Sequence, residues 1–239
     1  MIKMPSFTTL SLARSLQLLL ATTSPLQCLL DRPGIAHEFC NRQAITILRQ
    51  DGFEKDAALL EQFLPELNNG VYWADTGWKN VNHYFEPGAG KGLWKFANAA
   101  EDFRFYYFLA LKNARRGLPH KAAFFLGAAA HLVQDLCVPH HASGQLFQGH
   151  QEYEAWAGKH FPDYAVKSQG IYLMRQPENF LINNAVIAHD FISWVNQGSS
   201  SYHAATLLLL PRAQRSTAGL FRHFLAAVAG CFLSRKAVA

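Results

Sequence analysis

Histidine and acidic residues recur at a helical spacing in the segment HLVQDLCVPHHASGQLFQGHQEYE, residues 131–154. His131 and Asp135 are four residues apart, and so are His150 and Glu154. Residues four apart on a helix share one face, with Cβ atoms about 5–6 Å apart, so each pair can close on one metal ion. Imidazole combined with carboxylate suits zinc, and several such groups close together suit more than one ion.

The elements around this segment must hold the two pairs in place. Residues 122–130 are apolar and rich in Ala, which predicts a helix whose His131 face is buried. Buried His and Asp side chains need partners. Pro139 is expected to end or kink this helix, with His140 and His141 in the turn that follows. One such pair alone is typical of a surface ion pair, but two pairs about twenty residues apart favour a metal site.

The segment resembles the bacterial family of zinc-dependent phospholipases C. The family pattern is His-x-x-x-Asp, then Pro-x-His-Ala, then His-x-x-x-Glu, and the chain has each part in this order. In the family, the next ligand lies six residues after the Asp. This spacing selects His141 as the ligand and leaves His140 as its neighbour.

The resemblance implies three further ligands nearer the N-terminus. These are His37 in AHEFCNRQAI, Asp75 in GVYWAD and His83 in NVNHYFEP. The HYFEP stretch is similar to the family's His-Phe-Tyr-x-Pro run. The resemblance covers about residues 33–160, and the C-terminal helices match the family only in character.

Carried over to this chain, the resemblance implies a multinuclear zinc site. One ion would be held by Asp75, His83, His131 and Asp135. A second ion would be held by His141, His150 and Glu154. Asp135 would bridge the first ion to a third, which His37 also contacts. The family completes the third site with an N-terminal Trp exposed by processing, and no Trp precedes Trp73 here. Two zinc ions are therefore expected, and the third site lacks one ligand.

The resemblance also implies hydrolysis of a phospholipid, such as phosphatidylcholine, to diacylglycerol and a phosphorylated headgroup. Zinc acts as a Lewis acid on phosphate oxygens and lowers the pKa of a water molecule toward about 7. Asp75 is the candidate general base, because its free oxygen could orient the attacking water. Neighbouring aromatic residues could face a quaternary ammonium headgroup or pack in the core. These are Tyr72, Trp73, Trp78, Tyr84 and Phe85.

Two other functions stay open. One is a related zinc-dependent single-strand nuclease, although His150 followed by Glu154 favours the phospholipase branch over the His-x-x-x-Asn of the nucleases. The other is a metal-binding protein without turnover. The formal net charge of +5 favours anionic partners, such as phosphate esters or an acidic membrane surface. Together with the family resemblance, it leads us to expect a phospholipid substrate and a membrane surface, and the resemblance to the phospholipase branch gives no expectation of nucleic acid. The four Cys form no Cys-x-x-Cys pair, which argues against a thiolate zinc site.

Hydrophobic periodicity predicts an all-α fold, a single compact helical bundle with the zinc site between helices and a long loop. The 239 residues suit one domain, expected over residues 31–239. Residues 1–30 resemble a poor signal peptide or an N-terminal amphipathic helix, so a secreted or extracytoplasmic location is expected. Helices are predicted over residues 35–50, 54–67, 96–114, 150–158 and 178–197, and one kinked or two helices over 206–233. The long loop is predicted over residues 71–92.

Overall fold

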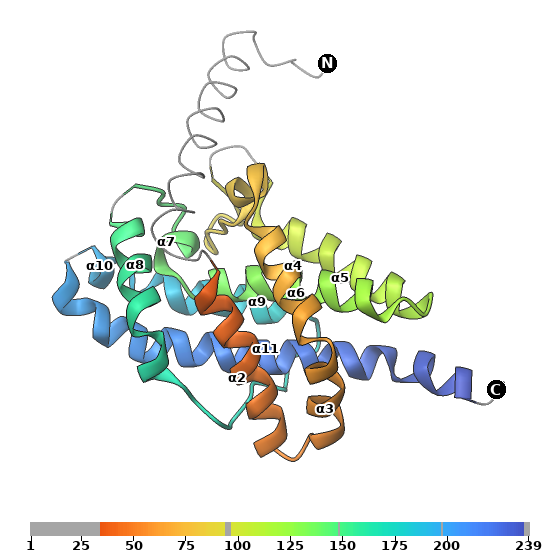
Figure 1. Ribbon diagram of the computed structural model, residues 1–239. Helices are drawn as coiled ribbons and strands as arrows, with labels where there is room; N and C mark the ends of the chain where they lie inside the picture. Colours follow the sequence, from red (N-terminus) through yellow and green to blue (C-terminus); the bar gives the residue numbers. More distant parts are fainter. Residues whose placement is uncertain (1–33, 94–96, 148, 197, 237–239) are drawn as a thin grey trace, which may run out of the picture.

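A helix rich in alanine, α6 (Pro119–Asp135), lies in the middle of the bundle and packs against α4 (Leu64–Ala74), α5 (Ala99–Arg115) and α9 (Glu178–His189) (Figure 1). The computed structural model describes residues 34–93, 97–147, 149–196 and 198–236. Half of the buried positions of α6 are alanine or glycine, which let the neighbouring helices approach its backbone closely. The helix that ends in the predicted ligands is therefore surrounded by other helices.

The remaining elements surround this centre. In chain order they are α2 (Ile35–Gln50), α3 (Glu54–Gln62), η1 (Gly77–Asn82), α7 (Pro139–Ala142), α8 (His150–His160), η2 (Phe161–Tyr164), α10 (Ile192–Val195) and α11 (Ser199–Lys236). Helix α11 runs along the bundle and crosses α2 (Figure 1). Large side chains that are fully buried, such as Phe103, Phe180 and Phe221, fill the space between these helices. Burying an aromatic side chain stabilises the fold by about 1.5–3 kcal/mol.

Two glycines set the crossing of α4 and α6. A Cβ atom on Gly70 would lie 1.9 Å from the carbonyl oxygen of Phe124, and one on Gly127 would lie 2.0 Å from that of Leu67. The two backbones therefore touch at a distance that only glycine allows. Since α4 ends beside Asp75, its C-cap residue, this close crossing brings that carboxylate toward the C-terminal end of α6.

The all-α prediction is confirmed. Within the residues that the structure describes there is no strand, only an isolated bridge between Glu86 and Lys91. No helix in the described part of the chain is both long and apolar enough to cross a membrane. The signal peptide or N-terminal helix predicted over residues 1–30 lies outside the described residues, and the single domain over 31–239 stays a prediction.

Several predicted boundaries were wrong. The segment predicted as one helix over 54–67 is two helices, which break at Phe63 ahead of Pro65, and residues 71–74 belong to α4 rather than to the long loop. Pro139 begins α7 instead of ending α6, so His140 and His141 lie in a short helix and not in a turn. Proline is favoured in the first turn of a helix, where its missing N–H is not needed.

The C-terminal predictions also need correction. The segment over 178–197 is divided at Asp190–Phe191 into α9 and α10. The apolar segment over 206–233 is one helix, α11, which already begins at Ser199 and contains Pro211. Tertiary packing along the bundle evidently outweighs the roughly 3 kcal/mol that a proline costs inside a helix.

Candidate metal centre

The first ligand group forms where α4, η1 and α6 end close together. His131 Nε2 lies 3.1 Å from Asp135 Oδ2 and 3.2 Å from His83 Nδ1. His83 Nδ1 in turn lies 2.8 Å from Asp135 Oδ2, which closes a triangle of ligand atoms. Asp75 approaches this triangle from the end of α4, with its Oδ1 atom 3.9 Å from His131 Nε2.

The dimensions of this triangle fit a bound zinc ion. Bonds of about 2.0–2.1 Å in a tetrahedral site hold neighbouring ligand atoms roughly 3.3 Å apart. The three edges, 2.8, 3.1 and 3.2 Å, come close to that separation. His83, His131 and Asp135 are all at most 3% exposed, so two imidazoles and a carboxylate face one another away from water. A cation between them satisfies all three groups.

Asp135 also faces a second position with its other oxygen. Its Oδ1 atom lies 3.3 Å from Nε2 of His37, whose ring lies against that of His131 with centroids 4.3 Å apart. His37 comes from the first turn of α2, so α2 and α6 together form this group. The Asp135 carboxylate therefore points one oxygen toward each of two possible ion positions.

The second predicted set of ligands gathers between α7 and α8. Glu154 Oε1 lies 2.9 Å from His150 Nε2 and 3.2 Å from His141 Nε2. His150 and Glu154 are one helical turn apart on α8, as the spacing predicted. Asp75 and Glu154 are the open members of the site, with side chains 36% and 39% exposed, and they mark its mouth.

The segment around His83 joins the two sets. The Nδ1 atom of His141 donates to the backbone oxygen of His83 at 3.1 Å, and the backbone N–H of Phe85 donates to the carbonyl of His141. The ring of Tyr84 stacks on that of His141 with centroids 4.7 Å apart and an interplanar angle of 10°. These contacts leave Nε2 of His141 directed at Glu154, as a ligand of the second ion would need.

The charges in the site stabilise one another. Burial disfavours the ionised form of Asp135, but the neighbouring His131 and His141 outweigh it and hold the pKa of this carboxyl well below its usual range. Burial likewise works against a charge on His141, yet Asp135 and Glu154 raise its pKa to about 9. The same balance, burial against His150 and His141, lowers the pKa of Glu154. The site is thus arranged to hold positive charge between its carboxylates.

The structure places all eight predicted residues in groups that could hold a metal ion. The groups are His37, His131 and Asp135; Asp75, His83 and His131; and His141, His150 and Glu154. In each group, the ligand atoms lie within 4.8 Å of one another. His140 is buried beside His150 and Tyr153 and belongs to none of the groups, in agreement with its place as a neighbour.

The neighbouring aromatic residues mostly pack rather than face the mouth. Trp73 contacts the rings of Tyr106 and Phe124, and Tyr84 and Phe85 are at most 9% exposed. The hydroxyl group of Tyr72 donates to Glu38. The side chain of Trp78 lies outside what the structure describes.

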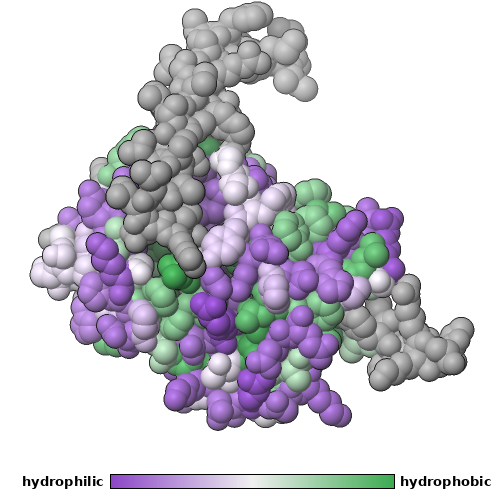
Figure 2. Space-filling model, viewed as in Figure 1, coloured by the Kyte–Doolittle hydropathy of each residue, from purple (hydrophilic) through white to green (hydrophobic). Residues whose placement is uncertain are grey.

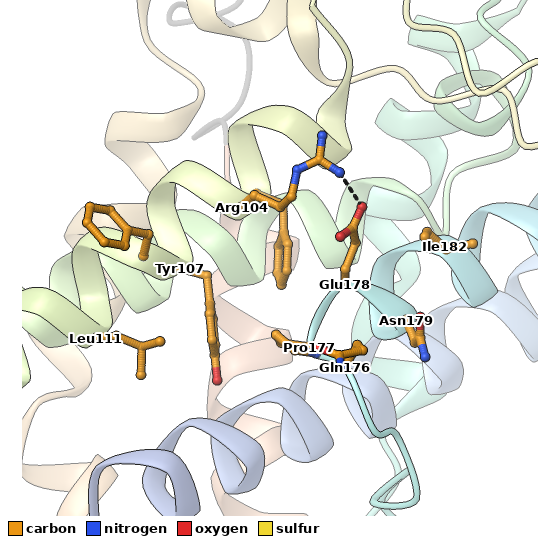
Figure 3. Close-up of a pocket in the computed structure, with 10 residues that line it drawn as sticks. Arg104, Tyr107, Leu111, Gln176, Pro177, Glu178, Asn179 and Ile182 are labelled. Atoms are coloured by element: carbon orange, nitrogen blue, oxygen red, sulfur yellow. Dashed lines mark hydrogen bonds and ion pairs between the residues drawn. The ribbon is translucent and has the colours of Figure 1, made fainter.

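A groove of about 490 Å³ lies apart from the ligand groups, between α5 and α9 (Figure 3). Arg104 and Glu178 form an ion pair of 2.7 Å across it, and Tyr107 and Leu111 line its wall. Figure 2 shows hydrophobic residues over α5, where Phe105 and Phe108 are about half exposed. None of the eight predicted ligands lines this groove.

The fold and the ligand groups agree with the comparisons with known proteins. A model of the family described as zinc dependent phospholipase C matches residues 36–206, so the chain belongs to this family. The resemblance read from the sequence is therefore confirmed. Zinc is the cofactor of the family, and the three ligand groups fit it.

Two curated relatives are phospholipases C. That of Bacillus cereus is 28% identical over 175 residues, which cover 66% of this chain and 60% of the relative. That of Clostridium perfringens is 23% identical over 191 residues, which cover 70% of this chain and 47% of the relative. The chain thus spans about half of the length of these proteins.

Two solved structures share the fold. The alpha toxin from Clostridium absonum matches with a TM-score of 0.73 and 20% identity, over 81% of this chain and 64% of that chain. An alpha-toxin of Clostridium perfringens from an avian strain matches with a TM-score of 0.70 and 21% identity, over 82% of this chain and 64% of that chain.

Proposed function

We propose that the chain is a zinc-dependent phosphodiesterase that hydrolyses a phospholipid to diacylglycerol and a phosphorylated headgroup. The observation that carries this proposal is the convergence of three imidazole–carboxylate groups, one of which includes the partly exposed carboxylate of Asp75. The names of the curated relatives, both phospholipase C, support the same reaction. Zinc ions held there would supply Lewis acidity for phosphate oxygens and a water molecule of lowered pKa.

The side chains of the centre have two proposed roles, metal binding and proton transfer. Asp135, His83 and His131 are buried and hold the ligand positions fixed, so the geometry needs no rearrangement when substrate arrives. Asp75 reaches the same group with Oδ1 and is partly open to solvent. Its second oxygen can orient a water molecule for attack on phosphorus and accept its proton, which makes Asp75 the proposed general base.

A membrane surface is the proposed partner. Phe147, on the loop between α7 and α8, is 75% exposed, and Trp194 on α10 is 45% exposed. The two segments are joined beside the second ligand group by a hydrogen bond from Asn196 to Gln145. Aromatic side chains at such a rim fit the boundary between lipid headgroups and acyl chains. A location outside the cytoplasm is also proposed, on the signal-like sequence of residues 1–30.

The test is release of phosphocholine from phosphatidylcholine vesicles by purified protein with known zinc content. We expect turnover that a chelator abolishes and added zinc restores. Asp75→Asn should lower kcat by about 10²–10⁴-fold while most of the bound zinc remains. Zinc-loaded protein that releases no phosphorylated headgroup from any phospholipid vesicle would overturn the proposal. Cleavage of single-stranded DNA instead would identify a nuclease, and binding without any turnover a metal-binding protein.

A further inference from the structure

A buried network of hydrogen-bonded polar side chains extends from the His37–Asp135 group. Nδ1 of His37 lies 2.9 Å from Oε1 of Gln134, and Nε2 of Gln134 donates to Asn41 Oδ1 and to Thr217 Oγ1, both at 3.1 Å. Asn41 donates in turn to Asn68 at 3.0 Å. These amide and hydroxyl groups are at most 9% exposed, so none of them can exchange its partner for water.

The direction of each hydrogen bond in this buried polar network can be assigned, starting from Thr217. The hydroxyl group of Thr217 has one hydrogen, and it donates this hydrogen to the carbonyl oxygen of Ala213 at 2.7 Å. Toward Gln134, Thr217 can therefore only accept, so Gln134 must turn its NH₂ group toward it. The carbonyl oxygen of Gln134 is then the atom that faces His37.

The same reasoning fixes the tautomer of His37. Because Oε1 of Gln134 can only accept, Nδ1 of His37 carries the proton. In the neutral imidazole, Nε2 then presents a lone pair. That lone pair faces Oδ1 of Asp135 at 3.3 Å, so two acceptors confront each other across a gap. A cation in this gap satisfies both atoms, and the separation matches neighbouring ligands of a tetrahedral zinc ion.

We propose that Gln134 is a positioning residue that prepares the third zinc position by fixing the tautomer and orientation of His37. The proposal rests on the proposed zinc centre and concerns the position for which the sequence predicted an incomplete set of ligands. The buried polar network joins α2, α4, α6 and α11, so the packing of these helices sets the distance between Nε2 of His37 and Oδ1 of Asp135. Hydrogen-bond partners behind a metal ligand commonly change metal affinity by about 10–100-fold.

The experiment measures zinc per chain after dialysis at defined free zinc, for the protein and for three variants. His37→Ala should remove one ion. Gln134→Leu should weaken the binding of that same ion by about tenfold or more and leave the other ions in place. Thr217→Val, which keeps the shape and removes the hydroxyl group that accepts from Gln134 and donates to Ala213, should weaken it less. Gln214→Leu is the matched control, because Gln214 is equally buried and anchors Tyr164 and Val166 away from the ligands.

A second readout separates positioning from mere stability. In metal-free protein labelled with ¹⁵N, the imidazole of His37 should be protonated at Nδ1, and Gln134→Leu should shift it toward the other tautomer. Unchanged affinity in Gln134→Leu, zinc content unaffected by His37→Ala, or a His37 proton on Nε2 would each overturn the proposal. The tautomer is measured without metal, so it is decided even if the proposed phospholipase activity fails.

Discussion

Asp135 is the residue on which the centre depends most. Its two oxygens face different partners, His83 and His131 on one side and His37 on the other. The spacing of His131 and Asp135 predicted that they would share one face of a helix. It could not predict which oxygen points where, because that depends on α2 and η1, which are distant in the sequence.

Glu154→Gln tests the second ligand group. The amide keeps the shape of the side chain but removes the charge that faces His141 and His150. We expect the loss of about one zinc ion per chain and of most activity, while the helical circular dichroism signal is retained. As a simple ion pair that is 39% exposed, Glu154 would contribute only about 0–1 kcal/mol and leave the zinc content unchanged.

The control for this variant lies two residues away on the same helix. Glu152 is exposed and belongs to none of the metal groups, so Glu152→Gln makes the same chemical change outside the site. Its zinc content should equal that of the parent protein. Equal zinc content in both variants would exclude Glu154 as a ligand.

The positions of the ligands were easier to predict than the residues behind them. His and acidic residues at a spacing of four carry their chemistry in their own side chains. Gln134 occupies a spacer position between His131 and Asp135, and nothing in the local pattern distinguishes it. Its role follows only from Asn41 and Thr217, which three-dimensional packing brings to it.

At the scale of helices, the apolar periodicity predicted most elements, but their ends were set by tertiary contacts. The helix over residues 35–50 ends at Asp51-Gly52 as predicted, since Gly52 takes a positive φ of 88° there. Residues 71–74 were assigned to a loop because they lie beside Asn, Gly and aromatic residues. They are helical because Gly70 and Gly127 let α4 continue against α6.

The crossing of α4 and α6 gives a prediction at this scale. Gly127→Ala places a methyl group 2.0 Å from the carbonyl oxygen of Leu67, so the two helices must separate. We expect a loss of several kcal/mol in the free energy of unfolding, typical of severe overpacking. In the protein that still folds, the affinity of the zinc ion nearest Asp75 should fall, because Asp75 moves away from His131. Urea denaturation and zinc titration measure the two effects.

Gly158→Ala provides the comparison for this variant. Gly158 lies within α8, and nothing lies within 4 Å of the position that a Cβ would take. Alanine has a higher helix propensity than glycine, so this change should stabilise the protein by about 0.5–1 kcal/mol. A Gly127→Ala variant that is as stable as Gly158→Ala would contradict the close crossing.

At the scale of the whole molecule, the ligand groups connect helices that are far apart in sequence. His37 lies on α2, Asp75 follows α4, His131 and Asp135 end α6, and Glu154 lies on α8. A metal ion held by such groups binds the folded chain and not the unfolded one, so its binding free energy adds to stability. A chelator should therefore lower the Tm of the entire bundle in one cooperative transition.

The amount by which a chelator lowers the Tm should increase with pH. In metal-free protein, Asp135 and Glu154 raise the pKa of His141 to about 9 against the burial that lowers it. Because the pKa of His141 is higher in the folded protein than the unfolded value of about 6.5, protonation of His141 stabilises the fold. This stabilisation, on the order of 3 kcal/mol, is fully present below about pH 6.5 and is lost as the pH rises through about 9. Zinc replaces the proton on the same nitrogen, so the zinc-bound protein does not lose it. The difference in Tm between zinc-bound and chelated protein should therefore grow from pH 6 to pH 9, as measured by differential scanning calorimetry. A difference that stays constant or shrinks over this range would show that His141 does not exchange a proton for the metal.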